Sequence, residues 1–452
     1  MTSFSAFRRR AVLVWLAASL AAGAQSPLSL RQAIDDALHK NPDTRAAHAG
    51  IDAAHADASL SRTQLFPQLN FTEDISRGND PVYVFGGKLR QQRFSAADFD
   101  LNALNRPQPI GNFTTRFSGS WMAFDSFRTQ KMIHGADLME KSAASAANAE
   151  DQKVIFGVVQ SFQGVLFAER EVAVAQHEQE TADALLSSVN DRVKAGLAVE
   201  SDRMSAEVNA AACKQGLIAA QGDLELAWAQ LRIAMGMPDL QESKLQPIEE
   251  HAYPASGALA DEVDTARKTR PDLMAAGDAQ AAQASAVSAA KYSFGPRISA
   301  YGNWEQDRPT FAGSGGNNWA AGVQIGIDIM PFSKRAQLAH ERAAKERADA
   351  QVAGYEQQVR LQVEQAHIRR QTAQLTLETA RAAIQQSAES LRILRNRYDA
   401  GLATITDLLR AEDAERQSQA NYWHAVYGNA TAYAQLLFAT GRLTPDAAEV
   451  LQ

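Results

Sequence analysis

Hydrophobic residues alternate with polar residues in four short segments of the chain. In the first segment, Leu69, Phe71 and Ile75 alternate with polar side chains such as Asn70 and Asp74. A period of two is typical of a strand with one apolar and one polar face. The pattern therefore predicts four amphipathic strands. They cover residues 66–78, 112–124, 295–306 and 318–330.

Helical periodicity dominates the remainder of the sequence. Two long runs without proline carry apolar residues at coiled-coil spacing, interrupted by Gln179 in one run and Ser387 in the other. At 1.5 Å per residue, a helix of roughly 65 residues is about 100 Å long. Pro42 and Pro271 are expected to kink or break two further helices. The predicted helices cover 28–63, 127–193, 200–236, 259–292, 333–398 and 405–440.

The chain contains an internal repeat. RVKAGLAVESDRMSAE begins at Arg192, and RYDAGLATITDLLRAE begins at Arg397. Each copy lies between a long helix and a shorter one, so each predicts the turn of an antiparallel helical hairpin. Gly196 and Gly401 supply the backbone freedom that a reversal of direction needs. Asp202 and Asp407 fall in the first turn of the returning helices, where negative charge is favoured; the acids also recur at corresponding positions.

The repeat divides the chain into two equivalent halves. Both halves read strand, strand, long helix, shorter helix after an opening helix, which predicts a mainly α protein with four strands. The first half holds about 24 extra residues, most of them in a Pro-, Gly- and Asn-rich stretch that we expect to be a long loop. The expected divisions are a signal peptide at 1–24, a first repeat at 25–236 with its loop at 79–111, a linker at 237–258, a second repeat at 259–441 and a tail at 442–452.

The N-terminal residues are typical of an export signal. Three arginines at positions 8–10 precede the apolar stretch AVLVWLAASLAAG, and AGA at 22–24 offers small residues for cleavage. Removal of the three arginines changes the net charge from −7 to −10, which argues against a nucleic-acid partner. Cys213 is the only cysteine, so an internal disulfide is excluded. No metal-binding, phosphate-loop or nucleophile motif was found, so we expect neither an enzyme nor a cofactor.

Four amphipathic strands in an exported protein favour an outer-membrane β-barrel. Lipid tolerates no open sheet edge, and four strands cannot close on themselves. Three copies contributing four strands each would give a barrel of twelve strands with an open lumen. The alternative is a small soluble sandwich beside a coiled coil.

The signal peptide, the duplicated halves and the two R-x-x-x-G-L-x-x-x-x-D motifs resemble the TolC family of outer-membrane efflux proteins. The resemblance covers residues 27–441. It implies a homotrimer in the outer membrane, with a shared 12-stranded β-barrel in lipid and a trimeric α-barrel extending into the periplasm. It also implies a passive, non-enzymatic duct. Its expected partners are a periplasmic adaptor and an inner-membrane transporter of the RND or ABC type.

The same resemblance assigns roles to the repeated motif. Tyr398 is expected to pair with Asp202 and hold the closed aperture, while Asp407 forms an acidic ring. Arg410 and Ala403 depart from the pattern of the best-known member, and Arg410 is expected to pair with Asp407. The adaptor-docking residues implied by the resemblance are Arg192, Gly196, Leu197, Arg397, Gly401 and Leu402.

A second interpretation is a soluble periplasmic coiled-coil scaffold or adaptor. An adaptor should carry one hairpin and compact β domains, whereas this chain predicts two equivalent hairpins and four amphipathic strands. The sequence therefore favours the duct, and it does not identify the cargo.

Overall fold

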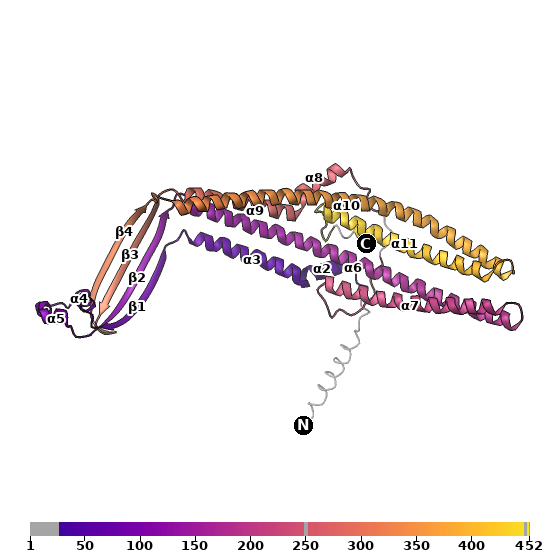
Figure 1. The fold of residues 1–452 in the computed structure, drawn as a ribbon, viewed down its shortest axis with the longest axis horizontal. Helices are drawn as coiled ribbons and strands as arrows, with labels where there is room; N and C mark the ends of the chain where they lie inside the picture. The colour runs from indigo at the N-terminus through magenta and orange to yellow at the C-terminus, as the bar shows by residue number, and fades with distance from the viewer. Residues whose placement is uncertain (1–26, 248–251, 447–449, 452) are drawn as a thin grey trace, which may run out of the picture. The chain divides into compact units, whose positions relative to one another are not determined.

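The computed structural model describes residues 27–247, 252–446 and 450–451 (Figure 1). The predicted signal peptide lies outside these residues. The chain divides into two compact units. One comprises Met1–His48, Ala146–Asp272 and Glu356–Gln452, and the other comprises Ala49–Ser145 and Leu273–Tyr355. Within the described residues, no helix is both long and apolar enough to cross a membrane.

The second unit contains a four-stranded antiparallel sheet in the order β1-β2-β3-β4. Its strands are β1 (Gln68–Gly78), β2 (Ile110–Phe124), β3 (Arg297–Arg308) and β4 (Gly316–Gly326). The register places Phe71, Phe117, Trp304 and Trp319 in one row across all four strands. Strand β4 ends at Gly326, four residues earlier than the alternation in the sequence predicts, because pairing with β3 ends at Arg297.

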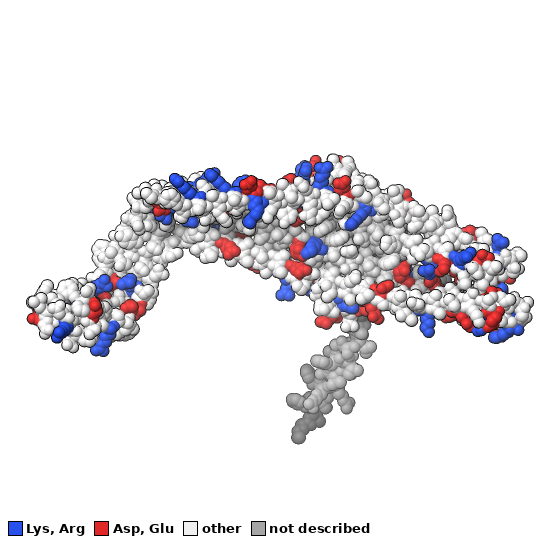
Figure 2. Space-filling view, viewed as in Figure 1, with Lys and Arg blue, Asp and Glu red and all other residues white. Residues whose placement is uncertain are grey.

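The two faces of the sheet differ in polarity, as the alternating pattern predicts. The aromatic row lies on one face, where large apolar side chains are exposed. Figure 2 shows the middle of the strands as a band without charged residues. The opposite face carries polar residues, including Ser76, Asn112, Thr114 and Glu305. The unpartnered apolar face and the unpaired outer edges of β1 and β4 leave the described sheet incomplete by itself.

In the same unit, four helical segments pack side by side through polar contacts. They belong to α3 (Pro42–Thr63), α6 (Arg128–Lys194), α9 (Pro271–Tyr292) and α10 (Phe332–Asp399). Arg62 of α3 lies 2.7 Å from the Asp137 carboxylate of α6. Lys141 of α6 lies 2.9 Å from the Asp278 carboxylate of α9. Many of the residues between these contacts are alanines or serines, which allow close helix approach.

The first unit contains the hairpin helices and the main hydrophobic core. Its shorter helices are α2 (Leu30–Lys40), α7 (Glu200–Ala234), α8 (Leu259–Thr269) and α11 (Ile405–Ala439). Leu30 and Ile34 of α2 pack with Phe162 of α6 and Leu231 of α7 in a fully buried cluster. A parallel bridge between Leu28 and Leu245 attaches the linker to the start of α2. Leu443 and Leu451 of the tail are also buried in this cluster.

The helices predicted around Pro42 and Pro271 are each broken at the proline. A glycine from the end of a hairpin helix packs closely against each break. Helix α2 ends before Pro42, and α8 ends before Pro271. Gly236 and Gly441, which follow α7 and α11, have positive φ angles of 66° and 68°. A Cβ at Gly441 would lie 2.8 Å from the Cα of Arg270. Glycine is therefore needed for both the backbone conformation and the close approach.

The prediction that residues 79–111 form a loop is wrong. It contains α4 (Pro81–Arg90), the 3-10 turn η1 (Ala96–Phe99) and α5 (Leu101–Asn105). The Asp80 carboxylate accepts a hydrogen bond of 2.9 Å from the Tyr83 amide, and Pro81 occupies the first helical position. Asp and Pro here start a helix instead of marking a loop. Gly87 lies inside α4 at a close approach to β2: a Cβ there would be 2.9 Å from Ile110 Cδ1.

Candidate functional site at the hairpin tips

The two copies of the repeated motif form the same turn. Helix α6 ends at Lys194 and α7 begins at Glu200, while α10 ends at Asp399 and α11 begins at Ile405. The Leu197 amide donates to the Arg192 carbonyl at 2.8 Å, and the Leu402 amide donates to the Arg397 carbonyl at 2.8 Å. Gly196 and Gly401 have φ angles of 71° and 73°. These are the features of a Schellman helix end, which satisfies the last carbonyls of each long helix.

The tips expose apolar side chains. Leu197 is 80% exposed and Leu402 is 69% exposed, and Val199 and Met204 are also exposed beside the first turn. Neither leucine is covered by the described residues, although each lies at the end of a well-formed turn. Figure 2 shows positive and negative residues at the ends of both hairpins. An apolar group with a charged rim is the chemistry of a protein-docking surface.

The second hairpin has a complete helix cap that the first lacks. Thr404 Oγ1 donates to Asp407 Oδ2 at 2.7 Å, and the Thr404 amide donates to the same carboxylate at 3.1 Å. These bonds lower the pKa of Asp407, with smaller contributions from the charges of Arg410 and Arg397. Among the described residues, no ion pair within 4 Å joins Arg410 to Asp407. In the first hairpin, Val199 occupies the cap position and offers no side-chain hydrogen bond.

Tyr398 lies between the two hairpins and contacts Arg192. The Arg192 guanidinium carbon is 4.9 Å from the centre of the Tyr398 ring, and Arg192 Nη2 donates to Asp399 Oδ1 at 3.3 Å. Burial raises the pKa of Tyr398, and the Asp202 charge adds to that effect. Within the described chain, Tyr398 makes no hydrogen bond to Asp202. The ring packs against Val189 in a small apolar cluster of the tip.

The contact between Arg192 and Tyr398 was missed by the sequence analysis. Arg192 and Arg397 occupy equivalent positions in the repeat, and their sequence neighbours are similar. Arg397, however, reaches only the Leu402 carbonyl of its own turn, at 3.5 Å. The two copies of the motif differ at the position after the arginine: Tyr398 follows Arg397, whereas Val193 follows Arg192. Only the second hairpin therefore offers an aromatic ring to the arginine of the other hairpin.

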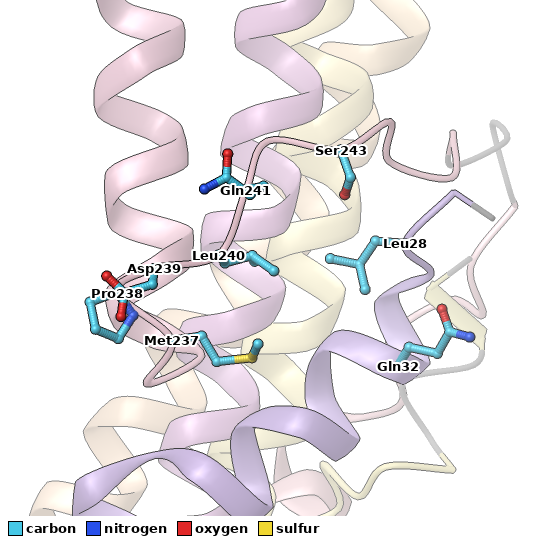
Figure 3. A pocket seen from close by; sticks show the side chains of 8 residues that line it. All are labelled: Leu28, Gln32, Met237, Pro238, Asp239, Leu240, Gln241 and Ser243. Carbon is cyan, nitrogen blue, oxygen red and sulfur yellow. The ribbon is translucent and has the colours of Figure 1, made fainter. Parts of the chain in front are cut away.

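A depression between the linker and the start of α2 was considered as a second site. It measures about 580 Å³, and its walls include Leu28, Met237 and Leu240 (Figure 3). Its polar residues are Gln32, Asp239, Gln241 and Ser243, and their side chains do not converge on one point (Figure 3). No cluster of His, Cys, Asp or Glu that could hold a metal ion occurs among the described residues. The hairpin tips are therefore the better candidate.

Comparison with known proteins gives a consistent family assignment. The family model of the outer membrane efflux protein matches residues 33–237 and 263–442. The chain is 25% identical to outer membrane protein OprJ of Pseudomonas aeruginosa over 411 residues, which cover 87% of this chain and 79% of OprJ. It is 25% identical to protein CyaE of Bordetella pertussis over 441 residues, which cover 93% of this chain and 86% of CyaE.

Solved structures show the same fold. The CmeC outer membrane channel of Campylobacter jejuni aligns with a TM-score of 0.78 at 17% identity, covering 94% of this chain and 89% of CmeC. The family model spans both halves of the internal repeat, including both hairpin tips. The chain belongs to the outer membrane efflux protein family.

Proposed function

We infer that this protein is the outer-membrane exit duct of an efflux or secretion system, with a long periplasmic extension. The observation that carries the inference is the sheet: one face is apolar and exposed, and both edge strands lack a partner among the described residues. A sheet of this kind is unstable in water and incomplete in lipid. Family membership supports the same conclusion.

The proposed assembly is a homotrimer. Pairing of β1 of one copy with β4 of the next would close three sheets into one barrel, and the apolar faces would then contact lipid. The polar faces would surround the lumen. The long hairpins of the copies would join side by side as an α-barrel in the periplasm. The proposed duct conducts passively and performs no catalysis.

The proposed docking surface for a periplasmic adaptor is the pair of tips. Leu197 and Leu402 are exposed, and the positive-φ glycines hold them at the ends of the turns. Arg192 and Arg397 would complete this surface from the last helical turns. An adaptor that binds separated tips better than packed tips shifts the equilibrium toward the open state. An inner-membrane transporter of the RND or ABC type would supply the energy.

The proposed aperture consists of Asp202, Tyr398, Asp407 and Arg410. Hydrogen bonds from Thr404 lower the pKa of Asp407 and so favour its charged form. Three copies of this charge near one axis would repel each other, and Arg410 would partly compensate. Contacts between hairpins, such as that of Arg192 with Tyr398, would hold the tips together against this repulsion.

Membrane fractionation followed by planar-bilayer recording tests the proposal. The mature protein should be recovered in the outer membrane, migrate as a trimer in mild detergent and form discrete conducting channels. The runner-up, a soluble periplasmic scaffold, requires recovery in the soluble periplasm and no conductance. Recovery of a soluble monomer would contradict the duct.

A further inference from the structure

The inserted segment between β1 and β2 folds back onto the polar face of the sheet. The Tyr83 hydroxyl of α4 lies 2.9 Å from Ser76 Oγ of β1. Gln91, which caps the C-terminus of α4, donates to Asn112 Oδ1 of β2 at 2.8 Å. Ser76 and Asn112 are paired residues on the polar face. Figure 1 shows α4 at the end of the strands to which these contacts attach it.

The attachment of α4 is buried and hydrogen-bonded. Gln91 and Asn112 are both buried, and Asn112 Nδ2 donates to Asp307 Oδ1 at 2.7 Å. Asp307 is fully buried and also accepts a hydrogen bond of 2.9 Å from Thr114. These bonds satisfy the Asp307 carboxylate and the Gln91 amide nitrogen, while Gln91 Oε1 has no hydrogen-bond partner among the described residues. A Cβ on Gly316 of β4 would lie 2.0 Å from the Arg90 carbonyl, so the segment also fits closely against the last strand.

The other side of α4 is apolar and exposed. Val82 is 81% exposed and Leu89 is 49% exposed. These two residues are seven apart on the helix and lie opposite Val84 and Gly87, which are buried. We refer to Val82 and Leu89 as the outer side of α4. The described residues of one copy do not cover the outer side of α4, so this apolar surface remains exposed to water.

Charges near the outer side have partners within one copy. Arg90 Nη1 lies 3.8 Å from the Glu305 carboxylate of β3. Lys88 Nζ lies 2.5 Å from the Asp98 carboxylate, and that contact lowers the pKa of Asp98 to about 2. Asp80 and Asp100 accept hydrogen bonds at the starts of α4 and α5. The outer side of α4 can therefore meet another copy of itself without placing these acids against each other as free charges.

In a closed barrel, the polar face of each sheet surrounds the lumen, so α4 lies inside the mouth. Its outer side then faces the axis, where symmetry brings equivalent residues of all copies together. Burial of Val82 and Leu89 there removes apolar surface from water. We propose that the insertion closes the outer mouth: the outer side of α4 packs against the same side of the other two copies. This rests on the trimeric duct proposed above.

Cysteine cross-linking in isolated outer membranes tests the closure. The native thiol is first removed with Cys213→Ser, and Val82→Cys or Leu89→Cys is added singly to the full chain. Oxidation with copper–phenanthroline should convert part of each variant from the monomer band to a covalent dimer on a non-reducing gel. Val323→Cys is the matched control: its exposure of 66% lies between those of Val82 and Leu89, but it is on the apolar face of β4 and should give no dimer.

The outcomes separate this inference from the proposed function. Dimers at both α4 positions, without dimers at Val323, support the closure. Absence of dimers from a protein that remains trimeric in mild detergent overturns the closure and leaves the duct intact. Dimers at Val323 as well would indicate collisions between assemblies and would count against the closure. A protein that is monomeric in detergent would refute both.

Discussion

Arg192 is predicted to stabilise the closed state of the tips. It reaches from the end of α6 to Tyr398 and Asp399 at the end of α10, so it connects the two hairpins of one chain. Arg192→Gln removes the positive charge and keeps most of the side-chain length. The variant should therefore weaken the connection between hairpins without altering either turn.

The magnitude follows from the two contacts. A cation–π contact at a partly exposed site contributes about 0.5–1 kcal/mol. An ion pair between partly exposed groups contributes about 0.2–1 kcal/mol. Together they stabilise packed hairpins by about 1 kcal/mol in each copy. If three copies open together, the sum is about 3 kcal/mol, which corresponds to a change of roughly 150-fold in the ratio of open to closed channels.

Single-channel recording in planar bilayers measures this ratio directly. Arg192→Gln should raise the fraction of time that the channel is open and leave the conductance of the open state unchanged. Arg397→Gln is the matched control for the contact between hairpins, because Arg397 acts within its own hairpin: it donates to the Leu402 carbonyl, and its charge acts on Asp407. Tyr398→Phe should retain most of the wild-type behaviour, since the ring remains. An Arg192→Gln channel indistinguishable from the Arg397→Gln channel would refute the reasoning.

Three further outcomes concern stability and can be checked by thermal or denaturant unfolding in detergent. Arg370 is 1% exposed and bonds to linker carbonyls, so Arg370→Ala should lower the free energy of unfolding by about 3 kcal/mol, and a loss below 1 kcal/mol would contradict this. Gly441→Ala should destabilise by more than the roughly 1–2 kcal/mol of a left-handed backbone, whereas Gly428→Ala, in open space on a helix, should be neutral or stabilising. Burial raises the pKa of Glu178 from 4.5 to about 7, so the folded state binds the extra proton between these values and loses stability as the pH rises through them; Glu178→Gln should abolish that loss.

The repeated turns could be predicted from sequence because their determinants are local. A glycine after a long helical run, followed by an acid in the next first turn, specifies a reversal whatever surrounds it. The four strands were also predictable, since each keeps one face apolar. The helices of the inserted segment were not, because Gly86 and Gly87 favour a loop by propensity. The Asp80 cap and Pro81 at the first helical position start α4 in spite of that propensity.

The residues that join the hairpins could not be predicted, because they depend on which helices become neighbours. Arg192 and Arg397 have equivalent positions in the repeat, yet only Arg192 lies under an aromatic ring of the other hairpin. Asp407 was predicted to form an acidic ring, which stays a prediction, and in the described chain its carboxylate completes a helix cap. The local sequence is compatible with either role, a helix cap or a ring of charges. The neighbours of the residue in the folded protein decide which role it has.

The junctions beside Pro42 and Pro271 show what the duplication has kept and what it has changed. In both halves, a positive-φ glycine abuts the residue before the proline, and that residue donates to the last residue of the shorter hairpin helix of the same half. Asn41 Nδ2 donates to the Ala234 carbonyl at 2.9 Å, and Arg270 Nη1 donates to the Ala439 carbonyl at 3.3 Å. The backbone arrangement is retained, although an amide and a guanidinium perform the same task.

The tips follow the same rule. Both turns keep their glycine geometry, while one helix start is capped by Thr404 and the other begins after Val199 without a side-chain cap. In the proposed trimer, two kinds of tip would therefore alternate around the aperture. The capped hairpin is the more firmly held of the two, since an N-cap contributes about 1 kcal/mol. Opening should begin at the first hairpin, whose returning helix starts without a side-chain cap.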